Sequence, residues 1–137
     1  MKRLIGLDLG SKTLGVAISD SLRFSAQGLT TIRFNENNYQ DALLKLDELL
    51  SEYEVEKIIL GYPKHMNGDL GDSALRSEKF KKKLENKGIE VVLWDERLSS
   101  VVAQKQMIAM DLSRKKRKEI IDEIAAINIL QGYLDSI

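Results

Sequence analysis

The order and spacing of the apolar segments constrain this 137-residue chain more than any other feature. Three strand-like runs, at 4–9, 14–19 and 24–34, follow one another with only short polar links between them. Links of that length join antiparallel neighbours, so the first third of the chain predicts a three-stranded meander. Two further short runs, at 57–62 and 89–94, each follow a helical pattern, which is typical of parallel crossover connections.

Helical periodicity fills the spaces between these runs and the end of the chain. The spacing of apolar residues predicts helices at 39–50, 73–86, 98–110 and 119–134. The expected fold class is therefore α/β, with a five-stranded mixed sheet, three antiparallel strands first, and helices on both faces. No internal repeat or long linker divides the chain, so we expect a single domain over 1–137.

Composition excludes several classes of protein. The chain has 21 lysines and arginines against 21 aspartates and glutamates, so it is not basic throughout. The absence of cysteine excludes a disulfide scaffold, a thiolate zinc site and a cysteine nucleophile, and agrees with the cytoplasmic location that we expect. No apolar run exceeds four residues, so the sequence predicts neither a membrane-spanning helix nor a signal peptide.

Several carboxylates occupy positions where burial should disfavour a charge. Asp8 lies near the end of the first strand, and Asp95 and Glu96 directly follow V-V-L-W. Asp122 begins a line of small and apolar residues along the last helix. Taken singly, these acids have structural explanations: turn capping, pairing with Arg97, or the dipole of a helix. Taken together, they lie where ligand crevices form in open sheets, at the carboxyl ends of strands.

An acidic cluster at that edge would raise the pKa values of its carboxyl groups unless a cation neutralised it. With no cysteine and one histidine, His65, the available ligands are oxygens, which suit Mg²⁺ or Mn²⁺. Two such ions about 4 Å apart would activate water and stabilise the leaving oxygen of a phosphodiester. Metal-dependent hydrolysis is therefore one hypothesis for these acids, beside ordinary structural pairing.

Two basic clusters interrupt the balanced charge pattern. Five consecutive cations, which we call the basic run, precede Asp122: Arg114, Lys115, Lys116, Arg117 and Lys118. Such a run is most often a solvated loop, but beside an acidic crevice it would bind a polyanionic backbone in a salt-dependent way. The second cluster, Lys79 with Lys81, Lys82 and Lys83, predicts a solvated helix face. For His65, in the loop after Pro63, we favour a surface role over a general base.

Four blocks of sequence, in a fixed order, carry a resemblance to a known family. G-x-D-x-G at 6–10 continues to G-V-A at 15–17, and G-Y-P at 61–63 is followed by N-G. D-E-R-L-S-S stands at 95–100, and D-E-x-A-A opens the block at 122–135. These blocks resemble the YqgF family, small bacterial RNase H-like proteins also called RuvX-type Holliday junction resolvases. The resemblance covers nearly the whole chain.

The resemblance implies an RNase H-like fold and a divalent-metal-dependent nuclease that helps to mature the 5′ end of pre-16S ribosomal RNA. Asp8, Glu96 and Asp122 would be the catalytic, metal-binding acids, with Mg²⁺ or Mn²⁺ as cofactor. Lys12, Arg97 and the basic run would contact the substrate. The implied partners are structured RNA and ribosomal precursor particles. The roles of Asp95, Glu123 and His65 remain open.

Three alternatives use the same residues. A Holliday junction resolvase would act on four-way DNA junctions, and symmetric cutting would favour a homodimer over a monomer. A non-catalytic nucleic-acid-binding module would bind RNA without metal-dependent cleavage. The glycine-rich block around Asp8 also resembles the phosphate loops of actin-like and sugar-kinase ATPases, which pair two such domains around a nucleotide.

Overall fold

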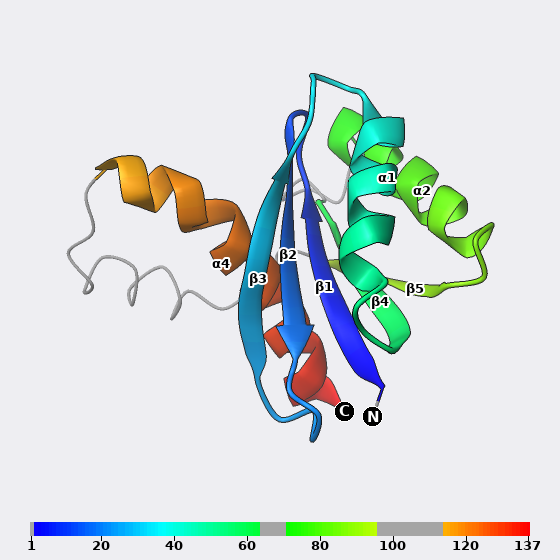
Figure 1. Cartoon of the computed structure of the whole chain (residues 1–137), viewed down its shortest axis with the longest axis vertical. Coiled ribbons are helices and arrows are strands. Elements are labelled where there is room, and N and C mark those ends of the chain that lie inside the picture. Colours follow the sequence, from blue (N-terminus) through cyan, green and yellow to red (C-terminus); the bar gives the residue numbers. More distant parts are fainter. Residues whose placement is uncertain (1, 64–70, 96–113) are drawn as a thin grey trace.

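A computed structural model of the chain describes residues 2–63, 71–95 and 114–137, and for 114–120 and 122 it describes only the course of the helix. Five strands form one mixed sheet in the order β3-β2-β1-β4-β5 (Figure 1). β1 pairs antiparallel with β2 and parallel with β4. The predicted arrangement, with three antiparallel strands first, is confirmed. The strands are β1 (Arg3–Leu9), β2 (Thr13–Ser19), β3 (Ala26–Arg33), β4 (Val55–Tyr62) and β5 (Glu90–Asp95).

The described helices cover both faces of the sheet (Figure 1). α1 (Tyr39–Leu50) and α2 (Asp72–Glu85) pack on one face, and α4 (Arg114–Ser136) packs on the other. The larger core cluster lies between the sheet and the α1–α2 layer, and the smaller one lies between the sheet and α4. None of the helices described is long and apolar enough to cross a membrane.

The ends of the elements have local causes. The side chain of Asn38 caps α1 by accepting a hydrogen bond from the backbone N–H of Asp41 at 3.2 Å. β4 ends at Tyr62 because Pro63 has no N–H to donate. After α2 the chain turns at Gly88, whose φ of 87° lies in the region that glycine favours.

α4 begins five residues earlier than the periodicity predicts. The predicted helix starts at 119, whereas the observed one starts at Arg114. The basic run therefore forms the first turns of α4 and is not a loop before it. The predicted helix at 98–110 lies outside the described residues, as does the loop at 64–70.

The two-residue period of β1 decides which face its side chains occupy. Ile5 and Leu7 belong to the core under α1 and α2, and Leu4 belongs to the core under α4. Gly6 faces α4, because a Cβ built on it would meet Leu130 and Ala126 of that helix. By the same alternation, Asp8 lies on the α4 face of the sheet.

α4 approaches β1 so closely at Gly6 that no side chain fits there. A Cβ on Gly6 would lie 2.7 Å from the Cβ of Leu130 and 2.8 Å from the carbonyl oxygen of Ala126. The contact at Gly28 of β3 is looser, since its nearest atom is the Cδ1 of Ile127 at 3.3 Å. The helix backbone is therefore fixed against β1, while its contact with β3 includes movable side-chain ends.

We expect Gly6→Ala to lower the free energy of unfolding by about 2 kcal/mol or more, because a backbone carbonyl of α4 must move to admit the methyl group. Urea unfolding followed by circular dichroism measures this change. Gly28→Ala is the matched control, and its cost should stay below about 1 kcal/mol because the end of Ile127 can rotate away. Equal costs for the two variants would contradict a fixed α4–β1 contact.

Candidate active site

Asp8 lies in a row of residues near the carboxyl ends of the parallel strands. Across β2 it is opposite Gly15. Its neighbour Leu7 is opposite Leu60 of β4, so the next position of β4, Gly61, stands beside Asp8 on the same face. The carboxylate of Asp8 is thus flanked on both neighbouring strands by residues without side chains, which leaves these strands free of groups that would crowd a ligand.

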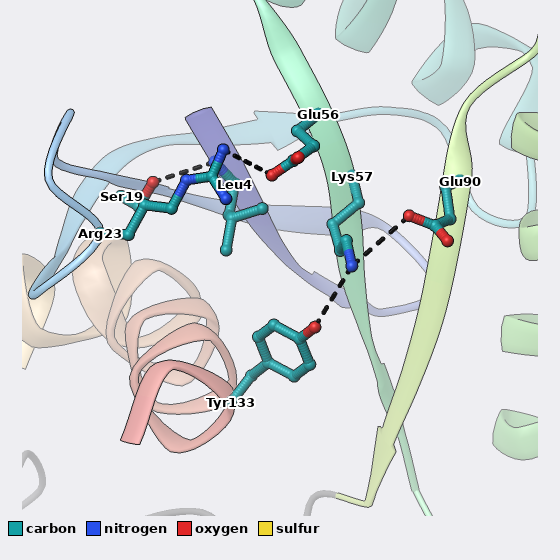
Figure 2. Close-up of polar contacts among 7 residues, drawn as sticks. All are labelled: Leu4, Ser19, Arg23, Glu56, Lys57, Glu90 and Tyr133. Atoms are coloured by element: carbon teal, nitrogen blue, oxygen red, sulfur yellow. Dashed lines mark hydrogen bonds and ion pairs between the residues drawn. The ribbon is translucent and has the colours of Figure 1, made fainter. Parts of the chain in front are cut away.

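α4 crosses the strands of the sheet, since Gly132 lies against Trp94 of β5, Ala126 over Gly6 of β1 and Glu123 over Gly28 of β3. Near its end, Tyr133 accepts a hydrogen bond of 3.4 Å from Nζ of Lys57, at the opposite edge of the sheet (Figure 2). Ala126 lies over Gly6 in the middle of the sheet. Position 122 is one helical turn, about 6 Å, before Ala126, and Asp8 is two strand positions, about 7 Å, beyond Gly6. The close contact of α4 with β1 is at Gly6, two positions before Asp8, and toward its beginning the helix passes over Gly28 of β3.

Asp95 is the last residue of β5, and β4 lies between this strand and β1, which carries Asp8. Trp94 belongs to the α4 face with Tyr133, at a ring-centroid distance of 5.8 Å, so Asp95 lies by alternation on the α1–α2 face. Its partner across the ladder, Tyr62, confirms this face, because the Tyr62 hydroxyl donates a 2.5 Å hydrogen bond to Glu78 of α2. That hydrogen bond also raises the pKa of Tyr62. Asp95 therefore does not share a face with Asp8.

The other predicted site residues are described to different extents. Lys12 is exposed in the turn between β1 and β2, where its carbonyl accepts a 3.0 Å hydrogen bond from the N–H of Phe34. Asp122 and the basic run have helix positions in α4, and their side chains lie outside the description. Glu96, Arg97 and His65 lie outside the described residues altogether.

The described residues alone do not form a metal site. Among them, no group of three or more aspartate, glutamate or histidine side chains is placed to hold an ion. Of the three predicted ligands, Asp8 is the one whose side chain the structure describes. Its oxygens, on the glycine-flanked row, fit a hard divalent cation such as Mg²⁺ or Mn²⁺.

The beginning of α4, with the basic run, extends beyond β3 and away from the sheet (Figure 1). The cations occupy helix positions 114–118, so they precede the predicted acid at 122 along the helix, which rises about 1.5 Å per residue. A helix start carries a partial positive charge, which adds to the positive charge of these residues. This end of the molecule is therefore suited to approach by an anion.

Glu123 occupies a place that the sequence left undetermined. A Cβ built on Gly28 of β3 would lie 3.5 Å from both the Cβ and the Oε2 of Glu123, so this carboxyl group packs over β3 and not beside Asp8. Burial raises the pKa of Glu123 above its ordinary value of 4.5. The sequence signal for this position is the pair Glu123 and Ile127, which are one helical turn apart, together with a glycine in β3 that leaves room for both side chains.

The raised pKa of Glu123 gives a pH-dependent prediction. A carboxyl group whose pKa is higher in the folded chain stabilises the fold while protonated, and this contribution is lost as the pH rises through the raised pKa. In EDTA, we expect Glu123→Gln to unfold at a higher temperature than wild type at pH 7. The difference should disappear below pH 4.5, where both chains carry a neutral group.

Differential scanning calorimetry across this pH range measures the difference. Glu36→Gln, at an exposed position, is the control for removing a negative charge without changing a buried group. A destabilised Glu123→Gln at pH 7 would mean that the carboxylate makes a stabilising contact in its charged form.

Comparison with known proteins identifies relatives along nearly the whole chain. A family model described as "RuvX: Holliday junction resolvase" matches residues 2–136. Proteins named "Putative pre-16S rRNA nuclease" are similar in sequence. The one from Bacillus pumilus is 53% identical over 136 residues, covering 98% of this chain and 99% of the relative. The one from Bacillus subtilis is 52% identical, with the same coverage.

Solved structures of resolvases share the fold. RuvC of Thermus thermophilus in complex with a Holliday junction substrate has a TM-score of 0.60 at 11% identity, covering 99% of this chain and 95% of RuvC. Fowlpox virus resolvase with Holliday junction DNA has a TM-score of 0.57 at 17% identity, covering 98% and 97%. The predicted RNase H-like fold is confirmed by this similarity.

Proposed function

Because the chain belongs to the RuvX family, we propose that it is a metal-dependent nuclease that acts in the 5′-end maturation of pre-16S ribosomal RNA. The family and the named nucleases indicate a hydrolase acting on phosphodiester bonds. The structural observation that carries the proposal is the carboxylate of Asp8, held between two glycine positions at the carboxyl edge of the sheet.

The proposed ligands of the metal are Asp8, Glu96 and Asp122. When bound, Mg²⁺ or Mn²⁺ would activate water and stabilise the leaving oxygen. The chain's own part is to hold the carboxylates in fixed places. Asp8 lies on a strand paired on both sides. Strand alternation places Asp95 on the face opposite Asp8, which argues against Asp95 as the ligand of this pair, and the family resemblance assigns the role to Glu96.

Substrate contacts are proposed for Lys12, Arg97 and the basic run. Lys12 is exposed in the turn that begins after Asp8 and β1, so its ammonium group can contact a phosphate near the bond to be cut. The cations at the start of α4 would hold a more distant part of the backbone. We further propose that residues 1–137 form one nuclease domain that acts in the cytoplasm on precursor ribosomal particles.

A second candidate substrate is the four-way DNA junction, which the description of the matching family favours. Cutting two strands symmetrically needs two active sites, so this activity would require a homodimer. Light scattering of the protein with and without a junction distinguishes a dimer from a monomer.

We expect Asp8→Asn, Glu96→Gln and Asp122→Asn each to lower the cleavage rate of pre-16S ribosomal RNA by more than about 100-fold, the upper range for changes around a metal ligand. The assay compares Mg²⁺, Mn²⁺ and EDTA, with a four-way DNA junction tested in parallel. Asp95→Asn is the matched control, since Asp95 lies on the other face of the sheet. Its rate should stay within about 10-fold of wild type, the lower range for such changes.

Each pattern of cleavage decides between the functions. Cleavage of the junction alone would replace RNA maturation by junction resolution. Binding of RNA without cleavage, equal in wild type and the three variants, would leave a non-catalytic binding module. A loss for Asp95→Asn equal to that for Glu96→Gln would contradict the assignment of Glu96.

We expect replacement of two cations of the basic run, Lys115→Gln/Lys116→Gln, to flatten the salt dependence of RNA binding. Each phosphate contact contributes about 0.7 to the slope of log K against log salt for a single strand, so the slope should fall by about 1.4. The control Lys2→Gln/Lys87→Gln removes the same charge at the opposite edge of the sheet. An unchanged slope in the first variant would return the basic run to a solvated role.

A further inference from the structure

A groove of about 640 Å³ lies on the side of the sheet opposite α4, between the start of α1 and one side of α2. Its lining combines cationic, aromatic and aliphatic side chains: Tyr39, Leu75, Arg76, Lys79, Lys82 and Lys83. The size is that of pockets that hold small ligands or a part of a polymer. The proposed metal ligands do not belong to this lining.

The residues of α2 that line the groove follow one another at helical spacing. Leu75 and Arg76 lie four and three positions before Lys79, and Lys82 and Lys83 lie three and four positions after it, so the five form one stripe of the helix. The sequence predicted a solvated face for all the lysines of this cluster. The structure divides them, since Lys79, Lys82 and Lys83 line the groove and Lys81 does not.

The groove has a surplus of positive charge that the described residues do not neutralise. Among the described lining residues, Asp72 is the one acid, against four cations. Among the described side chains, no ion pair involves Arg76 or the three groove lysines, whereas Lys45, Lys57 and Lys87 each have an acidic partner. Unpaired cations gathered in a concave surface attract a polyanion.

The apolar part of the groove suits a planar base. Leu75 is 49% exposed in the groove lining, so an apolar surface is open beside the cations. The guanidinium of Arg76 lies 5.9 Å from the centre of the Tyr39 ring, so the two form a cation–π contact at the groove wall. Single-stranded nucleic acids are held in this way, with phosphates on cations and bases on apolar or aromatic side chains.

The groove opens at the same edge of the sheet as Asp8. Asn37, which also lines it, donates its backbone N–H to the carbonyl of Ser11 at 2.8 Å. Ser11 and Lys12 form the turn after β1, three and four residues beyond Asp8. A nucleic-acid chain that is bound at Asp8 and runs over this turn would pass exposed Lys12 and reach the groove on the other face.

We propose that the groove between α1 and α2 binds the single-stranded RNA that adjoins the bond cleaved at Asp8. Lys79, Lys82 and Lys83 contact its phosphates, and a base rests on Leu75 and Tyr39. The inference rests on the proposed nuclease function and extends it. It makes the enzyme select RNA with a single-stranded extension over a blunt duplex.

The test measures the binding of a fluorescein-labelled RNA hairpin by fluorescence anisotropy in EDTA, where cleavage does not occur. One hairpin carries a single-stranded extension of about 10 nucleotides, within the range of single-strand sites, and the other is blunt. Lys79→Gln/Lys83→Gln should weaken binding of the extended RNA about 10-fold and lower its salt slope by about 1.4. Binding of the blunt hairpin should change less than about 2-fold, because it does not reach the groove.

Two further variants separate charge from general effects. Lys79→Arg/Lys83→Arg keeps both charges and should bind like wild type. Lys2→Gln/Lys87→Gln removes two charges elsewhere and should also bind the extended RNA like wild type. Equal weakening of both RNAs by the groove variant, or weakening of neither, would overturn the proposal.

A cleavage assay in Mg²⁺ with wild type and Asp8→Asn keeps the two proposals apart. Normal binding by Lys79→Gln/Lys83→Gln together with cleavage that depends on Asp8 would reject the groove and keep the nuclease. Selective weakening of the extended RNA without any cleavage by wild type would reject the nuclease, and with it the groove as part of a substrate path.

Discussion

The contact between the backbone of α4 and Gly6 of β1 determines the geometry of the proposed site. The strand carries Asp8 and the helix carries Asp122, so the relation between these acids depends on how closely the two elements pack. A small residue at the crossing lets the helix carbonyl of Ala126 come within reach of the sheet. Metal ligands must be held within a few tenths of an ångström, which needs a rigid contact of this kind.

Polar contacts fix the second half of α4, while its first half extends away. Gln131 accepts a 2.9 Å hydrogen bond from the N–H of Ala26 and donates one of 3.3 Å to the carbonyl of Phe24, so it joins α4 to the start of β3. Lys57 of β4 connects Tyr133 of α4 to Glu90 of β5 (Figure 2). The helix is thus anchored at one end, and its other end, with the basic run, extends away from the sheet, where substrate contacts are proposed.

The sheet could be predicted from the sequence because link length decides strand direction, and short turns and helical connections leave few alternatives. Asp8 could be chosen as a candidate site residue because a charged side chain is unusual in an apolar strand. The start of α4 was missed because five cations oppose the positive end of a helix dipole. The face that Asp95 occupies depends on strand alternation in β5. The position of Glu123 depends on how α4 packs over Gly28. The α1–α2 groove arises only when Tyr39 and the stripe of α2 meet in space.

The glycines around Asp8 divide the selective constraints on this part of the sheet into two kinds. At Gly6 an added side chain collides with a helix, so natural variation there would be removed because the protein fails to fold. At Gly15 and Gly61 an added side chain would stand beside the carboxylate of Asp8, so variation would be removed because a ligand cannot approach. Substitutions at these neighbouring glycines would therefore cause loss of function in two ways: at Gly6 through a low amount of folded protein, and at Gly15 or Gly61 through a normal amount of inactive protein.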